Sequence, residues 1–226
     1  MEDLVMHPAR RVVITQVVEV VAALPASGTR MVGIDGVDGA GKTVFADELA
    51  WGLRAGGLQV IRASVDGFHN PAHVRYRLGR HSPVGYYQDS YDYTRLRERL
   101  LDPLRSGAAR SYVTAIFDVT EESPVDVEAR VAPPDGSVLV FDGIFLHRPE
   151  LADYWDCSVF LRVEREVALE RMVQRDGTPG GPDSQENPRY FEGQRIYLDT
   201  CRPESRASIV IDNNVLDQPR ILKRQP

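Results

Sequence analysis

The sequence predicts an α/β fold in which helices cover both faces of a mostly parallel sheet. Two observations predict it. Short apolar runs alternate with segments of helical pattern, which is the order expected for parallel strands joined by helices. The stretch GVDGAGKT, residues 36–43, fits the pattern G-x-x-x-x-G-K-[ST] and lies between the first expected strand and the next helix. Together they predict a three-layer P-loop NTPase sandwich with a small lid.

The composition fits one globular domain that spans residues 1–226. Hydrophobic residues make up 42% of the chain, which is enough to build a core. Acidic residues outnumber basic ones, 33 to 27, and the net charge of -6 argues against nucleic acid or an anionic membrane as a partner. Cys157 and Cys201 lack a C-x-x-C spacing, so we expect two free thiols in a reducing cytoplasm. A homo-oligomer is compatible with these numbers.

The N-terminal segment 1–28 contains the apolar run RVVITQVVEVVAAL, which at first looks like a signal peptide. Gln16 and Glu19 interrupt the run, no small-residue cleavage site follows it, and it is too short to cross a bilayer. We therefore expect an amphipathic helix that ends near Pro25 and packs on the domain, in a cytoplasmic protein.

The expected strands are short apolar runs, and one of them, at 138–143, follows the turn signal PPDG. In chain order they lie at 31–35 (MVGID), 58–66 (LQVIRASVD), 111–119 (SYVTAIFDV), 138–143 (VLVFDG), 157–163 (CSVFLRV) and 207–213 (ASIVIDN). Because parallel strands share one carboxyl edge, where ligands of such sheets bind, we expect Gly36, Asp66 and Asp142 to converge there.

Helical segments lie between these strands. One at 42–55 is closed by Gly56 and Gly57, and one at about 92–101 is stopped by Pro103. Two further helices are expected at 164–175 and 189–199. The segment between them, DGTPGGPDSQENP (176–188), is rich in Gly, Pro and polar residues, so we expect a mobile lid over residues 176–190.

The pattern at 36–43 is suited to holding phosphate. Its glycines allow backbone torsions that turn amide groups toward phosphate oxygens, and the positive end of the following helix faces the same point. Lys42 can reach the β- and γ-phosphates of ATP, and the Thr43 hydroxyl can ligate Mg²⁺. The expected nucleotide-binding residues are Gly36, Asp38, Gly39, Ala40, Gly41, Lys42 and Thr43.

A phosphate loop serves GTPases, ATPase motors and kinases alike. The chain contains no guanine-reading N-K-x-D sequence, which argues against a GTPase switch. A small-molecule kinase needs a carboxylate beside the γ-phosphate to accept the proton of the acceptor hydroxyl. Asp66, at the end of the second expected strand, is placed for this role; the alternative is an Asp that caps the following turn.

Beyond the loop, the sequence resembles the uridine kinase, pantothenate kinase and phosphoribulokinase superfamily of P-loop kinases, and bacterial uridine kinase-like proteins most of all. The pieces that carry the resemblance occur in the family's order: SVDGFH, DSYD, VFDGIFL, RMVQRD and RPESRASIVIDN. The resemblance implies a kinase that uses ATP and Mg²⁺, with a nucleoside such as uridine as the leading acceptor. It implies Asp66 as the catalytic aspartate, Asp142 near Mg²⁺ and substrate, and Arg171 and Arg175 as lid arginines.

The chain departs from the uridine kinases where they bind the acceptor. Tyr86 stands where their ribose-binding Asp falls, and FDVTEESP (117–124) lacks the His with which they read the base. DGFH and DSYD are as similar to the pantothenate kinase branch. A pantothenate or sugar kinase is therefore the main alternative, and a nucleotide-binding regulator with slow ATP hydrolysis is the alternative of another class. GTP is not excluded as the donor.

The acceptor pocket is expected to form from the segment after Asp66. HNPAHVRYRLGRHS (69–82) is rich in basic groups, which could hold a carboxylate or phosphate of the substrate or could simply be solvated. The candidate acceptor-binding residues are Asp66, His69, Arg75, Tyr86, Asp142 and Gln194. His7 and His147 look like ordinary surface residues.

Overall fold

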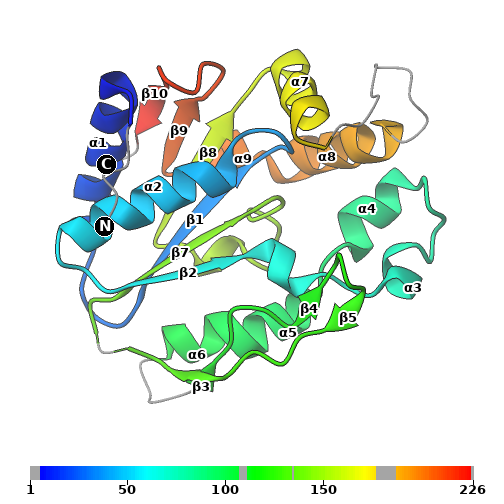
Figure 1. Ribbon diagram of the computed structural model, residues 1–226, viewed down its shortest axis with the longest axis horizontal. Coiled ribbons are helices and arrows are strands. Elements are labelled where there is room, and N and C mark those ends of the chain that lie inside the picture. The colour runs from blue at the N-terminus through cyan, green and yellow to red at the C-terminus, as the bar shows by residue number, and fades with distance from the viewer. Residues whose placement is uncertain (1–5, 107–110, 134, 177–186, 225–226) are drawn as a thin grey trace.

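The computed structural model describes residues 6–106, 111–133, 135–176 and 187–224. Its centre is a six-stranded sheet in the order β10-β9-β8-β1-β7-β2 (Figure 1). The strands are β1 (Arg30–Gly36), β2 (Val60–Ser64), β7 (Val138–Gly143), β8 (Cys157–Arg162), β9 (Ile209–Asp212) and β10 (Arg220–Arg224). All neighbours pair in parallel except β10, which runs antiparallel to β9 at the edge. The predicted mostly parallel α/β fold is confirmed.

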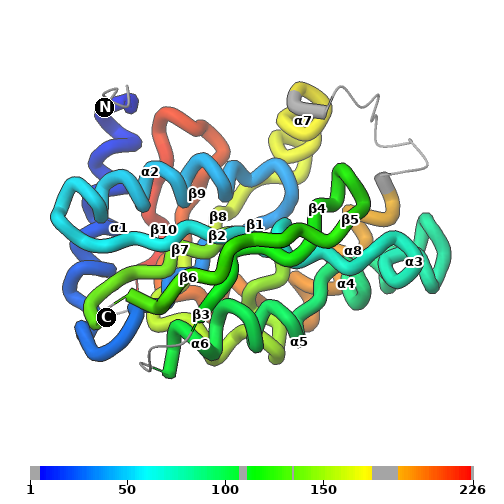
Figure 2. The backbone as a smooth tube through the Cα atoms, turned by 60° about the horizontal axis from the view of Figure 1, so that its bottom comes forward, coloured from blue at the N-terminus to red at the C-terminus, as the bar shows by residue number. Residues whose placement is uncertain are grey.

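Helices cover both faces of the sheet (Figure 2). Each face has its own apolar core. On one face lie α1 (Pro8–Ala22) and α2 (Lys42–Ala55), packed on alternate side chains of the central strands such as Val32 and Ile34. On the other lie α5 (Tyr93–Leu96), α6 (Asp102–Arg105) and α8 (Asn187–Cys201), whose apolar residues share a core with Met31 and Phe141. Every residue of β1 and β7 is buried, as expected for strands covered on both faces.

The N-terminal helix of the prediction is α1. It begins with Pro8 after His7, whose side chain accepts a hydrogen bond from the Ala9 amide, and its buried residues face α2. His7 is exposed, as expected. In the part of the chain that the structure describes, no helix has the length and apolarity needed to cross a bilayer.

The prediction that Pro103 stops the helix after residue 92 is wrong. Asp92 caps α5 (Tyr93–Leu96), which continues through a π-helical turn (Arg97–Leu101) into α6 (Asp102–Arg105). Pro103 therefore lies in the first turn of α6. A π turn shifts the hydrogen-bond pattern by one residue, so the missing amide of Pro103 breaks less of the helix than it would in a regular interior.

The single strand predicted at 111–119 is also wrong. The segment instead holds two short strands outside the main sheet: β3 (Ser111–Tyr112) pairs with β6 (Arg130–Val131), and β4 (Phe117–Asp118) pairs with β5 (Ser123–Pro124). Its apolar side chains pack against the helices and η1 rather than into the central sheet, since Tyr112 belongs to the cluster of α5 and α6.

Several short elements gather where the parallel strands end. They are η1 (Val65–Phe68), α3 (Ala72–Arg75) and α4 (Pro83–Asp89). Helix α8 (Asn187–Cys201) leads into α9 (Pro203–Arg206), which directly precedes β9 and so lies at the opposite, amino edge of the sheet. Helix α7 (Arg165–Asp176) corresponds to the expected helix at 164–175. Most of the predicted lid, 177–186, lies outside the described residues, and 187–190 form the first turn of α8. Figure 1 shows α4, α7 and α8 on the side of the molecule to which the phosphate loop, residues 36–43, points.

Candidate active site

The phosphate loop connects β1 to α2 at the carboxyl edge of the sheet. Gly39 and Gly41 have φ angles of 76° and 85°, in the left-handed region that favours glycine. A Cβ atom on Gly39 would overlap the Ala168 carbonyl of α7, so only glycine fits between the loop and that helix. Helix α2 starts at Lys42 directly after Gly41, which directs its first amide groups at the concave side of the loop.

Lys42 and Thr43 are each oriented by one hydrogen bond: Lys42 to the start of the phosphate loop, and Thr43 to the neighbouring strand β7. The Lys42 ammonium donates to the Val37 carbonyl at 2.9 Å, so its positive charge lies across the loop. The Thr43 hydroxyl donates to Asp142 Oδ2 at 2.8 Å, and Arg62 donates to Asp142 Oδ1 at 3.0 Å. Asp142 itself is buried at the end of β7, next to β1 in the sheet.

This donor set fits Mg²⁺. A hydroxyl and a carboxylate are the hard oxygen ligands that Mg²⁺ takes, and in phosphate-transfer sites one or two carboxylates suffice because substrate phosphates complete the shell. The described residues contain no group of three or more His, Cys, Asp or Glu side chains that could hold a metal by themselves. Thr43 and Asp142 are therefore the residues that would hold the ion together with nucleotide.

The loop that follows β9 supports the phosphate loop from outside. The buried Asn213 side chain donates to the Ala40 carbonyl at 2.8 Å. Arg171 of α7 donates to the carbonyls of Asn213 and Asn214 at 3.0 and 2.7 Å, and to that of Gly39 at 3.4 Å. The predicted lid arginine thus lies against the phosphate loop; burial, and then the charge of Arg10, lower its pKa. Arg175 lies in α7, with its side chain outside the described part.

Arg10 extends this support to α1, which is separated from the phosphate loop along the chain by β1. Its guanidinium forms a buried ion pair with Glu48 of α2 at 2.6 Å and donates to Asn213 Oδ1 at 3.2 Å. It also donates to the Leu216 carbonyl at 2.8 Å. The N-terminal helix is therefore connected to the Ala40 carbonyl through one buried amide side chain.

Beneath the phosphate loop lies a buried polar network that corrects the prediction for His147. His147 is not on the surface: only 3% of it is exposed, and its Nδ1 lies 2.6 Å from Asp35 Oδ2. Its Nε2 lies 3.0 Å from Ser158 Oγ, and the Tyr197 hydroxyl also donates to Asp35. Asp35 in turn accepts from the Gly36 amide at 2.7 Å. The Asp–His–Ser order resembles a hydrolase triad, but substrate cannot reach it, so its role is to hold the end of β1.

On the acceptor side, Asp66 lies in η1, two residues past the end of β2. It is exposed, and its amide donates to the Ser64 hydroxyl at 3.3 Å, so Ser64 and not Asp66 provides the cap of this turn. The Tyr91 hydroxyl donates to Asp66 Oδ1 at 3.4 Å. An exposed carboxylate with one weak partner is free to accept a proton from a bound hydroxyl, which favours the predicted base over the predicted cap.

His69 lies half-buried beside this carboxylate. Its Nδ1 lies 2.9 Å from the Asp66 carbonyl, and its ring centroid is 4.5 Å from that of Tyr91. Burial lowers the pKa of His69, against the opposing effects of the Asp66 carbonyl and carboxylate. The lowered pKa favours the neutral form of this predicted acceptor-binding residue. Because Nδ1 faces a carbonyl, the neutral ring carries its proton there and leaves Nε2 as a hydrogen-bond acceptor.

Tyr86 and Gln194 are also in the site, and both contact Asp38 of the phosphate loop. The Tyr86 hydroxyl donates to Asp38 Oδ2 at 2.7 Å, and the Gln194 side chain donates to the same oxygen at 3.0 Å. Gln194 Oε1 accepts from the Asp38 amide at 3.2 Å. Burial, and then the charge of Asp38, raise the pKa of Tyr86. Helices α4 and α8 therefore meet the phosphate loop at Asp38.

Two of the arginines in the basic segment 69–82 form ion pairs with acidic residues of the same protein. Arg75 is buried, forms an ion pair with Glu122 and donates to the Asn70 carbonyl at 2.8 Å, so it does not stand open to an acceptor. Arg77 pairs with Asp89 at 2.8 Å. His73, Arg80 and His81 are exposed. These contacts favour the solvated, internally paired interpretation over a cluster that binds an anionic substrate.

Sequence reasoning gave no role to several of these side chains. Asn213 ends the last predicted strand, at the same sheet edge as Asp66, so its position was a usable signal. Tyr91 lies in the quoted piece DSYD, but nothing in the sequence pairs it with Asp66. Asp35, Arg62 and Tyr197 carry no local signal, because their partners lie far along the chain.

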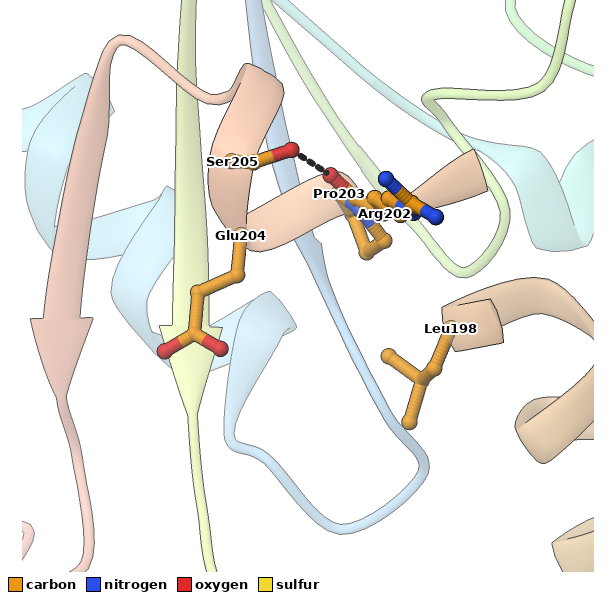
Figure 3. Close-up of a pocket in the computed structure, with 5 residues that line it drawn as sticks. All are labelled: Leu198, Arg202, Pro203, Glu204 and Ser205. Carbon is orange, nitrogen blue, oxygen red and sulfur yellow. Dashed lines mark hydrogen bonds between the residues drawn. The ribbon is translucent and has the colours of Figure 1, made fainter. Parts of the chain in front are cut away.

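A pocket elsewhere in the molecule holds none of the predicted site residues. It lies at the junction of α8 and α9 and is lined by Leu198, Arg202, Pro203, Glu204 and Ser205 (Figure 3). The close-up shows the Ser205 hydroxyl donating to the Arg202 carbonyl, at 2.8 Å, and Glu204 also forms an ion pair with Arg162. The Ser205 hydroxyl and the Glu204 carboxylate of this hollow are thus engaged with the protein itself.

Comparison with protein families matches residues 31–187 to the model of the phosphoribulokinase / uridine kinase family. This range includes the phosphate loop, Asp66 and Asp142, and it excludes α1. No curated protein is significantly similar to the chain in sequence.

Solved structures share the fold over nearly the whole chain. A possible uridine kinase from Bacillus stearothermophilus aligns with a TM-score of 0.68 at 24% identity, covering 88% of this chain and 97% of that one. A putative fructose transport system kinase from Silicibacter sp. TM1040 aligns at 0.58 and 22% identity, covering 88% and 94%. A D-glycerate 3-kinase from Cryptococcus neoformans aligns at 0.54 and 14% identity, covering 93% and 98%. At these identities the likeness establishes the fold alone.

Proposed function

The chain belongs to the phosphoribulokinase / uridine kinase family, and we propose that it transfers the γ-phosphoryl group of ATP to a hydroxyl of a small molecule. The observation that carries the proposal is the exposed Asp66 carboxylate at the same sheet edge as Lys42, Thr43 and Asp142. A site for the phosphoryl donor and a carboxylate that can accept a proton, placed together, support phosphoryl transfer rather than a nucleotide-dependent switch.

In this proposal each side chain has a distinct task. Lys42 and the amide groups of the phosphate loop bind and orient the phosphates, and Asp66 accepts the proton of the attacking hydroxyl. Thr43 and Asp142 would hold Mg²⁺, which would neutralise phosphate charge when bound. Neutral His69 contributes a hydrogen-bond acceptor next to the attacking hydroxyl. Arg171 braces the phosphate loop through the Gly39 carbonyl and the adjacent loop after β9 through the carbonyls of Asn213 and Asn214.

The acceptor of first choice is a nucleoside such as uridine. The family and the possible uridine kinase among the structural neighbours support it. Pantothenate or a sugar is the alternative, and the structural neighbours named as fructose transport system kinase and D-glycerate 3-kinase favour keeping it. A regulator that hydrolyses ATP slowly is the competitor from another class, because it would need the same phosphate loop but no acceptor.

The test is release of ADP in the presence of Mg·ATP and a panel of acceptors: uridine, cytidine, adenosine, pantothenate, D-fructose and D-glycerate. We expect one of them to stimulate ADP release and to gain a phosphoryl group, detected by mass. Release at the same slow rate with every compound would instead identify the regulator.

The variant Asp66→Asn separates binding from chemistry. It preserves shape but cannot accept the proton, so kcat is expected to fall by about 10² to 10⁴ while ATP affinity stays within a few-fold. Asp47→Asn is the matched control, because Asp47 is an exposed carboxylate on α2 that pairs with Arg62. A loss confined to ATP affinity would mean that Asp66 acts through Mg²⁺ and would contradict its role as base.

A further inference from the structure

Asp38 is an unusual residue to find inside a loop built for phosphate. A carboxylate next to the phosphates of ATP repels them, and only donors or distance reduce that cost. Here the carboxylate is turned toward α4 and α8, where the Tyr86 hydroxyl and the Gln194 amide both donate to Oδ2. Both donors are neutral, so they orient the charge of Asp38 without cancelling it.

The other carboxylate oxygen of Asp38, Oδ1, can still accept hydrogen bonds. Asp38 is only partly buried, and no donor within the described segments reaches its Oδ1. A carboxylate accepts several hydrogen bonds, so Oδ1 can take a further donor from a bound molecule. Because the Asp38 amide is bonded to Gln194 Oε1, the backbone at this residue is not the group offered to ligand.

Asp38 and Asp66 flank the same space. Tyr86, which donates to Asp38, and Tyr91, which donates to Asp66, both pack edge-on against the Phe145 ring, with ring centroids 5.4 and 6.5 Å from it. The Tyr91 ring also packs on the His69 ring at 4.5 Å. Asp66 approaches this aromatic cluster from η1, while Asp38 approaches it from the phosphate loop. A molecule that lies on His69 and Tyr91 with one hydroxyl at Asp66 therefore extends toward Asp38.

We propose that Asp38 is a specificity-determining residue that accepts a hydrogen bond from a second hydroxyl of the acceptor, so that the substrate is a polyhydroxylated molecule rather than a simple alcohol. The proposal rests on the kinase function proposed above. It assigns two carboxylates to two hydroxyls: Asp66 accepts the proton of the hydroxyl that is phosphorylated, and Asp38 binds a neighbouring hydroxyl that is unchanged.

The test compares acceptors that differ by one hydroxyl. The pairs are uridine with 2′-deoxyuridine and 3′-deoxyuridine, and D-glycerate with 3-hydroxypropionate, which keeps the carboxylate and the terminal hydroxyl. For the pair that supports ADP release, the wild type should prefer the fuller compound in kcat/KM by about ten- to hundredfold, the effect expected of one hydrogen bond to a charged group. Asp38→Ala should remove this preference by raising KM for the fuller compound alone.

Asp199→Ala is the matched control. It removes an exposed carboxylate of α8 that lies outside the acceptor site, so the preference for the fuller compound should persist. A rise in KM for both members of the pair, or a loss of ATP affinity in Asp38→Ala, would show that Asp38 only braces the phosphate loop and would overturn the proposal. A wild type that treats both members equally would overturn it too, with the kinase function intact. Absence of ADP release with every acceptor would instead overturn the kinase function, and this proposal with it.

Discussion

The imidazole of His69 lies between the Asp66 carbonyl and the Tyr91 ring, and this setting fixes its protonation. Donation from Nδ1 to the carbonyl selects the tautomer that leaves Nε2 without a proton. Burial lowers the pKa of His69 below the ordinary 6.5. At the residue scale, we therefore expect His69 to offer a hydrogen-bond acceptor rather than a cation.

We expect His69 to titrate below pH 6.5 in the folded protein. A lowered pKa means that the unfolded chain binds this proton more readily, so His69 contributes a loss of stability as pH falls below about 6.5, and none above it. NMR titration of the imidazole signals, with His69→Gln to assign the resonance, measures the value. A pKa above 6.5 would show that the carboxylates of Asp66 and Asp38 outweigh burial.

At the scale of elements, α1 is joined to the donor site by the buried ion pair of Arg10 and Glu48 and by Asn213. The family match starts at residue 31, after this helix. Every described contact of Arg10 lies in α2 or in the loop after β9, so α1 holds these two segments together beside the phosphate loop.

Arg10→Met should destabilise the protein by about 3–5 kcal/mol, because it leaves the Glu48 carboxylate buried without a charge partner. The double variant Arg10→Met with Glu48→Met should regain much of this loss, since no buried charge then remains unpaired. Urea unfolding of the wild type, both single variants and the double variant measures the coupling. Arg54→Ala on the exposed side of α2 is the control and should change stability by less than about 0.5 kcal/mol. Additive effects of the two single changes would contradict the coupling.

At the scale of the whole molecule, the phosphate loop lies at the carboxyl edge of the sheet and contacts segments that are far apart along the chain: α4, α7, α8 and the loop after β9. Nucleotide bound there would add contacts to the folded state only. Binding should therefore appear as added global stability.

Mg·ATP at about 100 times its Kd should raise the free energy of unfolding by about 2.7 kcal/mol, a Tm increase of roughly 5–10 °C for a domain of this size. Lys42→Ala should lose most of that increase, because the charge that binds the phosphates is gone. Thermal unfolding with ATP and with GTP, in the wild type and in Lys42→Ala, also identifies the donor. An undiminished increase in Lys42→Ala would place the nucleotide elsewhere.

The phosphate loop and the parallel sheet were readable from sequence because each depends on residues that are close along the chain. The backbone torsions and amide donors of the phosphate loop depend on residues 36–43 themselves. The ends of the apolar runs placed Asp66 and Asp142 at one edge of the sheet. The same local reasoning failed at Pro103, where a π turn absorbs the missing amide, and at 111–119, where an apolar run packs on helices instead of joining the sheet.

What only the tertiary structure decided is the direction and partner of each polar side chain in the site. His147 is buried because Asp35, 112 residues away, lies beside it, and Arg10 meets Asn213 across 203 residues. Arg75 was expected at the acceptor, but it is paired with Glu122. Asp38 faces α4 and α8 because Tyr86 and Gln194 donate to it. The sequence determined which residues reach the carboxyl edge of the sheet, because strand ends are local; their partners there were decided by packing between distant segments, which no local pattern records.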